Sequence, residues 1–167
     1  VYLYDYSIHH ALVNSVALKE AGIATDTPDP PKGSIERNPH TGEATGNLVE
    51  MATVLVTRVI PPYPAETYRS ALRFAIERCH AFGITSIQEA SATRRLLQLY
   101  NEFDRNESLN LSVTAHIVWN SQKWGEETPE QLDTLIAERD AFSTEHVDVN
   151  AVKLWLDGAP LPPHYSE

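Results

Sequence analysis

From residue 65 onward, apolar positions recur in two alternating patterns. In "PAETYRSALRFAIERCHAFG" (64–83), Leu72, Ile76 and Cys79 form one stripe at helical spacing, which predicts an amphipathic helix that closes at Gly83. Two further helices are expected at "SATRRLLQLYNEFDRN" and "TPEQLDTLIAERDAF", and strands at "ITSIQEA", "LNLSVTAHIVWN" and "VDVNAVKLWLD". The resulting order α-β-α-β-α-β is typical of parallel strands joined by helical crossovers, in a doubly wound sheet or a barrel.

The first 60 residues have a different pattern. "VYLYDYS" predicts a strand, and "HHALVNSVALKEAGI" predicts a short helix with Gly22 at its C-terminal end. "SIERNPHTGEATGNLVE" predicts two strands joined by a turn, and residues 48–60 have helix-like spacing up to Pro61. We therefore expect three segments.

The three expected segments are a barrel strand with a short helix (1–24), an inserted loop and β-hairpin (25–60), and the βα units of a partial barrel (61–167).

Composition excludes several classes of function. The 167 residues carry a formal net charge of −10 and no basic cluster, which argues against a nucleic-acid partner. The single cysteine, Cys79, excludes an intramolecular disulfide and a CxxC metal or redox motif. Neither a membrane-length apolar run nor a signal-peptide pattern is visible, so no membrane partner and a cytoplasmic location are expected. The chain begins at Val1 within a strand-like run, so we expect a piece of a longer protein.

Lys153 is the most informative single residue, because it interrupts the apolar strand "AVKLWLDGAP" (151–160). A buried cation must find a partner, change its pKa or react. Alternation places Lys153, Trp155 and Asp157 on one face of the strand. The lysine is either a snorkelling edge residue or a reactive amine that adds carbon dioxide and becomes a carbamate, an anionic metal ligand. In the metal-free chain, we expect the Lys153 side chain to face solvent or to contact a carboxylate on an adjacent strand. Glu89 is the nearest candidate by the order of the motifs.

Two adjacent histidines, His9 and His10, follow the first predicted strand, where sites of barrels and open sheets collect. Structural and functional roles both remain open for them. His116 lies within a strand and its direction is ambiguous. The sequence contains no H-x-H, HExxH or G-x-S-x-G motif, so it holds no complete catalytic set.

Four segments in order, "HHALVNSVALKEAGI", "IERNPHTGEATGNLVE", "GITSIQEA" and "AVKLWLDGA", resemble family-3 amidohydrolases, the branch of the metal-dependent amidohydrolase superfamily that includes N-substituted formamide deformylases. The resemblance implies a distorted (β/α)₈ TIM-like barrel with a small β domain, and C–N bond hydrolysis with divalent metal, usually zinc. Lys153 matches the lysine that is carboxylated and bridges the metal ions on the fourth barrel strand. His9 matches the histidine of the family pattern "GHSAWVNS", near the substrate, and Asp157 is the second expected substrate-binding residue. Ile8 and Leu12 replace the glycine and tryptophan of that pattern.

The other metal ligands of the resembled family fall outside this sequence. The chain is therefore expected to cover about strands two to four of the barrel, with a β-containing insertion. One ligand cannot hold a catalytic zinc, which needs at least three protein ligands. We expect an inactive, metal-free piece of a hydrolase whose substrate is a small amide-like molecule, and self-association through open sheet edges. The alternatives are a non-catalytic regulator of the same fold, like an exoenzyme regulator, and a self-standing α/β domain.

Overall fold

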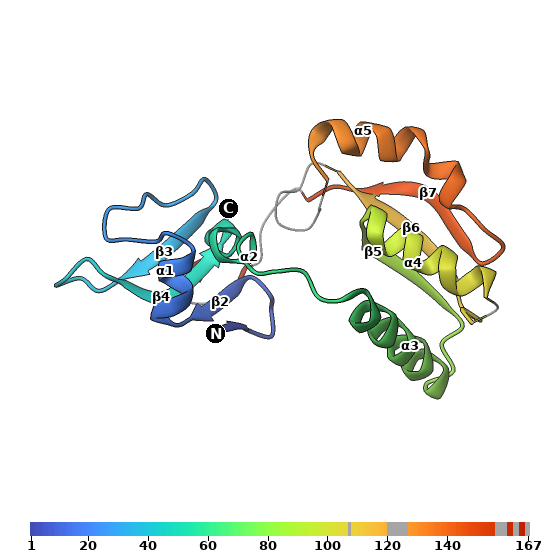
Figure 1. Ribbon diagram of the computed structural model, residues 1–167, viewed down its shortest axis with the longest axis horizontal. Coiled ribbons are helices and arrows are strands. Elements are labelled where there is room, and N and C mark those ends of the chain that lie inside the picture. The colour runs from blue at the N-terminus through green and yellow to red at the C-terminus, as the bar shows by residue number, and fades with distance from the viewer. Residues whose placement is uncertain (107, 120–126, 156–159, 162–163, 166–167) are drawn as a thin grey trace. The chain divides into compact units, whose positions relative to one another are not determined.

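The computed structural model describes residues 1–106, 108–119, 127–155, 160–161 and 164–165. The chain divides into two compact units, each with its own sheet (Figure 1). The first comprises residues 1–62 with the C-terminal residues from 156, and the second comprises residues 63–155.

The first unit is built on a four-stranded antiparallel sheet in the order β1-β2-β4-β3. Its elements are β1 (Tyr2–Tyr4), β2 (His10–Val13), α1 (Ser15–Glu20), β3 (Gly33–Arg37), β4 (Ala44–Glu50), the 3-10 turn η1 (Met51–Thr53) and α2 (Val54–Thr57). Two short antiparallel strands, β8 (Pro160–Leu161) and β9 (His164–Tyr165), also belong to it. The core contains Val13, Ile35, Leu48, Ala52 and Val56, all buried.

The structure corrects the expectation for the first segment. Residues 1–24 do not supply a strand of the parallel sheet, because β1 pairs antiparallel with β2 and belongs to the sheet of the predicted hairpin. The residues before Asn14 are a strand rather than the start of the helix: Ala11 and Val13 are buried while Leu12 is exposed, the period-two pattern of a half-buried strand. Helix α1 begins after Asn14, whose side chain accepts a hydrogen bond from the Ala17 N–H.

The second unit confirms the predicted alternation. Its elements are α3 (Ala65–Ala81), β5 (Ser86–Ala92), α4 (Arg94–Arg105), β6 (Ser112–Val118), α5 (Pro129–Ala137), the 3-10 turn η2 (Arg139–Phe142) and β7 (Val147–Lys153). The three strands are parallel, in the order β5-β6-β7. Helix α5 starts with a capping box between Thr128 and Gln131, as its Thr-Pro start predicts.

The hydrophobic core of the second unit lies between the sheet and its helices. Strands β6 and β7 contribute the buried residues Val113, Ala115, Ile117, Val147 and Val149. The three helices contribute Leu72, Ile76, Leu97, Tyr100, Phe103, Leu132 and Leu135. Because these side chains form one cluster, the helices cover a single face of the sheet, and the opposite face is available for a site. No helix in the described ranges is long and apolar enough to cross a membrane.

Hydrogen bonds between a buried carboxylate and a histidine tie α4 to the segment before β7. The Asp104 carboxylate, whose side chain is only 7% exposed, lies 2.7 Å from His146 Nδ1 and accepts a hydrogen bond from the His146 backbone N–H. Burial alone would raise the pKa of Asp104, but the polar groups that face it, from Thr144 and His146, outweigh burial and hold the pKa below its usual range. The ionised carboxylate therefore stabilises the fold.

The pH dependence of this contribution has a definite sign. A carboxyl whose pKa is lower in the folded state stabilises it above the unfolded value of about 3.9, and that contribution is lost as the pH falls through the folded value. Asp104→Asn should lower the free energy of unfolding by about 1–3 kcal/mol at neutral pH. The difference between variant and wild type should shrink at acid pH, where both side chains are neutral. Urea unfolding across this pH range tests it, with the exposed Asp133→Asn on α5 as control; an Asp104→Asn deficit that is constant with pH contradicts the assignment.

Candidate functional site

A β-bulge decides which face of the sheet Lys153 occupies. Val113 stands opposite Val147 and Thr114 opposite Asp148, but His116 stands opposite Ala151 and Val118 opposite Lys153. Between these pairs β6 advances by two residues and β7 by three, so β7 contains one extra residue. An extra residue moves the following side chains to the other face of a strand. Lys153 therefore does not share the helix-covered face with Val147, although strict alternation along β7 would put it there.

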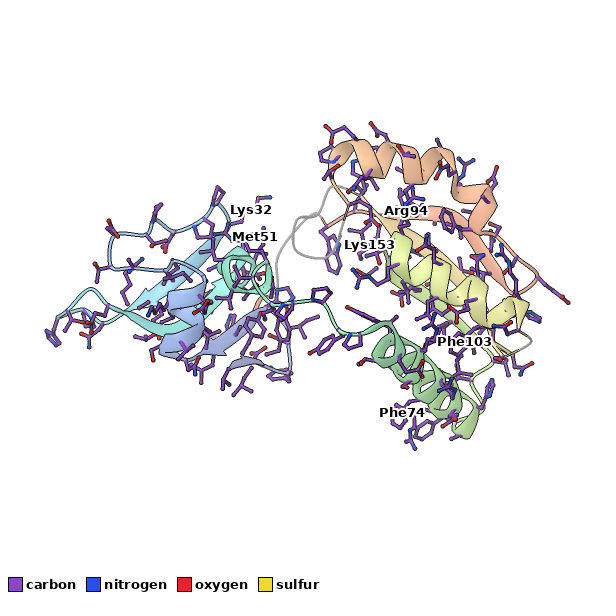
Figure 2. All side chains as sticks on the ribbon, in the orientation of Figure 1. Lys32, Met51, Phe74, Arg94, Phe103 and Lys153 are labelled. Atoms are coloured by element: carbon purple, nitrogen blue, oxygen red, sulfur yellow. The ribbon has the colours of Figure 1, made fainter. Side chains whose placement is uncertain are left out.

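The face opposite the helices carries polar side chains from all three strands. Gln88 on β5 is in register with Thr114 on β6, and His116 lies two residues further along the same strand. Lys153 lies at the end of β7 on this face, and its side chain is labelled in Figure 2. This arrangement is a row of hydrogen-bonding and ionisable groups across the sheet, and Lys153 is its member at the carboxyl end of a strand, where ligands bind in α/β folds.

The positive charge of Lys153 is met by an aromatic ring. Its Nζ lies 4.5 Å from the centroid of the Trp155 ring, a cation–π contact between residues on the same face. The expectation that Glu89 lies on a strand adjacent to that of Lys153 is wrong. Glu89 is on β5, which β6 separates from β7, and its carboxylate accepts hydrogen bonds from the Ser91 N–H and the Tyr100 hydroxyl.

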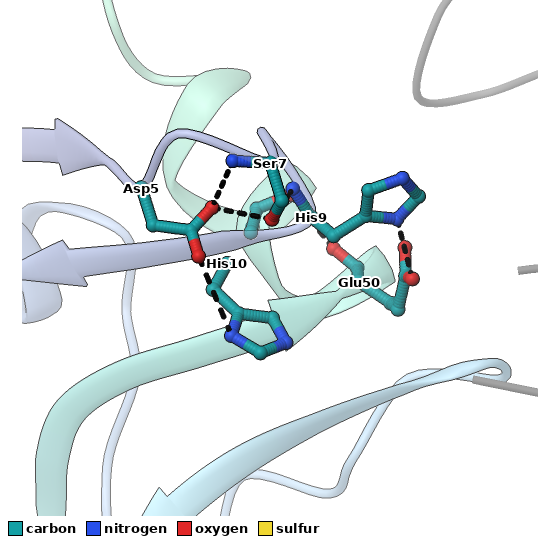
Figure 3. A network of polar contacts seen from close by, with 6 residues as sticks. Asp5, Ser7, His9, His10 and Glu50 are labelled. Carbon is teal, nitrogen blue, oxygen red and sulfur yellow. Dashed lines mark hydrogen bonds and ion pairs between the residues drawn. The ribbon is translucent and has the colours of Figure 1, made fainter. Parts of the chain in front are cut away.

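A second polar cluster lies in the first unit, around the turn from β1 to β2 (Figure 3). His9 Nδ1 is 2.6 Å from Glu50 Oε1, and the Glu50 backbone N–H donates to the His9 carbonyl at 2.8 Å. The His9 N–H in turn donates to Ser7 Oγ, and Ser7 donates to Asp5 through both its backbone and its hydroxyl. Hydrogen bonding from Ser7 lowers the pKa of Asp5. His9 is thus held by its side chain and by its main chain.

Two residues of this cluster have strained backbones. Ile8 has φ of 59° and Glu50 has φ of 50° with ψ of −121°. Both lie in the region that disfavours side chains with a Cβ, at a cost of order 1–3 kcal/mol each. Such strain concentrates at functional sites, where the surrounding structure enforces it. The family pattern that this segment resembles has glycine at the position of Ile8, and glycine adopts positive φ without strain.

The conformation of Ile8 predicts an unusual order of stability. Ile8→Gly should be more stable to urea unfolding than Ile8→Ala by about 1 kcal/mol, because alanine keeps the Cβ that disfavours positive φ. The same pair of substitutions at Val16, an exposed position in α1, should give the opposite order, with alanine more stable by about 1 kcal/mol. If alanine is the better residue at both positions, the strain at Ile8 does not exist.

The site residues expected from the sequence fall in separate units. Lys153 belongs to the second unit and His9 to the first. Asp157 lies outside the described residues. Sequence reasoning missed Glu50, which lies 41 residues from His9. The pairing of His10 with Val49 in the antiparallel sheet brings His9 and Glu50 together. The signal for this in the sequence is that Glu50 is a polar residue at the end of an apolar strand.

The described residues do not fit a complete metal site. Within the ranges that the structure describes, no three His, Cys, Asp or Glu side chains are grouped so that they could hold a metal ion. A catalytic zinc needs at least three protein ligands. Any metal chemistry would require residues beyond those described.

Comparisons with known proteins agree on one family. The model of the amidohydrolase family matches residues 1–166. The putative amidohydrolase YtcJ of Bacillus subtilis (strain 168) is 40% identical over 77 residues, 46% of this chain and 14% of that protein. The N-substituted formamide deformylase of Arthrobacter pascens is 32% identical over 107 residues, 62% of this chain and 20% of the relative.

The fold is shared with a solved structure. An uncharacterized metal-dependent hydrolase from Pyrococcus horikoshii OT3 superposes with a TM-score of 0.60 at 22% identity, covering 95% of this chain and 29% of that one. The chain thus matches less than a third of this protein and of each of the two relatives. Because the family match extends over nearly every residue, the chain belongs to the amidohydrolase family.

Proposed function

We propose that this chain is part of a metal-dependent hydrolase that cleaves the C–N bond of a small, amide-like, non-peptide substrate. The observation that carries the proposal is Lys153, which the bulge in β7 turns to the face opposite the helices in a parallel sheet of a family member. The similarity to a protein named as an N-substituted formamide deformylase supports the bond type. The parallel strands would correspond to about strands two to four of a TIM-like barrel.

Lys153 would act as a carboxylated lysine in the complete protein, meaning the full-length hydrolase that contains this chain. Its neutral amine would attack carbon dioxide, form an N–C bond and release one proton. The product is a carbamate, an anion on a long arm that suits a position between divalent ions. When carbon dioxide and metal are absent, the side chain of Lys153 would keep its contact with the ring of Trp155.

A divalent ion, zinc by resemblance, would supply Lewis-acid polarisation of the substrate carbonyl when bound. The residues of this chain would bind the metal ion and the substrate. Lys153, at the end of β7, would be one ligand of the metal ion. His9, in the turn before β2, would contact the substrate. Asp157 is proposed as a further substrate contact.

The open edges of the three-stranded sheet support a proposal about assembly. Among the described residues, β5 and β7 each pair with β6 alone, so each leaves one edge without a neighbouring strand. Such edges invite pairing with another chain. The isolated chain is expected to be a dimer or larger, and light scattering that shows a monomer at high concentration would contradict this.

The function is tested by incubating the complete protein with formanilide, a secondary formamide, and measuring released aniline. Hydrolysis is expected in the presence of zinc, with loss after chelation and recovery on adding zinc back. The isolated chain is expected to be inactive and to bind no stoichiometric zinc. Zinc-loaded complete protein that hydrolyses neither formanilide nor other N-substituted amides would overturn the proposal and favour a regulatory, non-catalytic protein.

A further inference from the structure

A pocket of about 400 Å³ lies between two helices of the second unit (Figure 1). One wall is α3, and the other is the C-terminal end of α4 together with Ser108 and Asn110. Ile76 and Phe103, each 5% exposed, supply apolar surface between the walls. The pocket therefore has polar rims and an apolar floor, the usual make-up of a site for a small molecule.

Two contacts between the walls hold the pocket open in a defined shape. Arg69 Nε and Nη2 donate to the two carboxylate oxygens of Glu102, at 2.6 Å and 3.1 Å. His80 Nε2 lies 2.8 Å from the carbonyl oxygen of Asn110, and it must be the donor because a carbonyl only accepts. Arg69 and His80 lie three turns apart on α3, about 16 Å along the helix axis. The walls are therefore pinned at both ends of the pocket before any ligand binds.

Two charged side chains of the lining have no ion-pair partner within the described part of the chain. The Arg73 guanidinium makes neither a hydrogen bond nor an ion pair there, and its Cζ lies 5.9 Å from the centroid of the Phe103 ring. Because Phe103 belongs to α4, this contact turns Arg73 across the pocket rather than along α3. Glu77 follows Arg73 by one turn, but arginine before glutamate is the weaker orientation of such a pair. Both side chains are exposed and so can meet a ligand.

The balance of charge decides which class of ligand suits the pocket. Arg69 and Glu102 neutralise each other, so Arg73 and Glu77 remain as one positive and one negative group among the described lining residues. A simple anion or a simple cation would leave one of the two without a partner, whereas a zwitterion pairs with both. Guanidinium groups bind carboxylates through two parallel hydrogen bonds, and a carboxylate accepts from an ammonium group. Residues at i and i+4 have Cβ atoms about 5–6 Å apart, so a ligand with both charges on one carbon can reach both side chains.

We infer that this pocket binds the zwitterion of an α-amino acid with an apolar side chain. Its carboxylate pairs with Arg73, its ammonium group pairs with Glu77, and its side chain packs against Ile76 and Phe103. The inference goes beyond the proposed function and does not depend on it, because it uses only contacts and charges of α3, α4 and the two residues Ser108 and Asn110.

The test measures binding of three small molecules to the complete protein by ligand-observed NMR. L-Leucine carries both charges, 4-methylpentanoate is leucine without the ammonium group, and 3-methylbutylamine is leucine without the carboxylate. Leucine is expected to bind with a dissociation constant of about 1 mM or lower, and each analogue about tenfold more weakly, the effect of losing one charge-assisted contact. An analogue that binds as tightly as leucine would overturn the inference, as would the absence of leucine binding at about 10 mM.

Two substitutions assign the charges to their residues. In Arg73→Gln, leucine should bind about tenfold more weakly and no better than 3-methylbutylamine, because the carboxylate has lost its partner. In Glu77→Gln, leucine should weaken similarly and bind no better than 4-methylpentanoate. The matched control is Arg78→Gln on the same helix, since Arg78 contacts the ring of Phe82 and does not line the pocket; it should leave leucine binding unchanged. Leucine binding that either Arg73→Gln or Glu77→Gln leaves at the wild-type level would show that the ligand site is elsewhere and would contradict the assignment.

Discussion

Lys153→Ala in the complete protein is expected to lower the turnover of formanilide by at least about 10³-fold, because under the proposed role of Lys153 the substitution removes a metal ligand and with it several kcal/mol of transition-state stabilisation. The lysine lies at the carboxyl end of β7 on the face opposite the helices, and no other lysine or arginine lies in that strand. The substitution should lower both kcat and the metal content of the protein. The measurement is steady-state hydrolysis with elemental analysis of the same preparation.

The stability of the fold should hardly change with the same substitution. Lys153 contacts the ring of Trp155, and an exposed or half-exposed charge contact contributes less than about 1 kcal/mol. A matched control is Lys19→Ala at the end of α1, which should affect neither turnover nor stability. A Lys153→Ala variant that unfolds at much lower urea concentration than wild type would show that the lysine is structural.

Gly46→Ala is expected to produce the largest loss of stability of any substitution considered in the first unit, about 2–4 kcal/mol in the free energy of unfolding. Gly46 has φ of +98°, and a Cβ added there would overlap the carbonyl oxygen of Val13. That carbonyl belongs to β2, the strand that pairs with β4. The methyl group would therefore separate the two central strands of the sheet.

Gly42 provides a control because it also has positive φ, but no atom lies close to where its Cβ would be. Its φ is +74°, but a Cβ there would meet nothing within 4 Å. Gly42→Ala should cost only about 1–2 kcal/mol, the penalty for a left-handed residue with a side chain. Urea unfolding of both variants separates the two causes, and equal losses would mean that the close approach to Val13 does not matter.

The elements of the second unit could be predicted from local pattern because each amphipathic helix and apolar strand has its own period. The face of Lys153 follows from a different property. Alternation within residues 151–157 puts Lys153 on the face away from Val152, whereas alternation counted from Val147 would place it under the helices, and the extra residue in β7 removes the conflict. A bulge depends on pairing with a neighbouring strand, which local pattern does not contain.

The cluster around His9 was beyond sequence reasoning for the same physical reason. His9 and Glu50 meet because β2 pairs with β4, a contact between segments about forty residues apart. The helical spacing of the residues after Asn14 extends the predicted helix over the short strand "HALV". The sequence therefore predicts a barrel strand and a helix in a segment that contains two strands of the antiparallel sheet. The sequence shows that Ile8 replaces a glycine of the resembled family, but the positive φ of Ile8 is seen only in the structure.

The most direct test of the account is the chemical state of Lys153 in the complete protein. After incubation with ¹³C-labelled bicarbonate and zinc, the ¹³C spectrum should contain one carbamate signal per chain, and the signal should be absent from Lys153→Ala prepared in the same way. An active, zinc-loaded wild type with no labelled carbamate would contradict the assignment of Lys153 as the metal ligand.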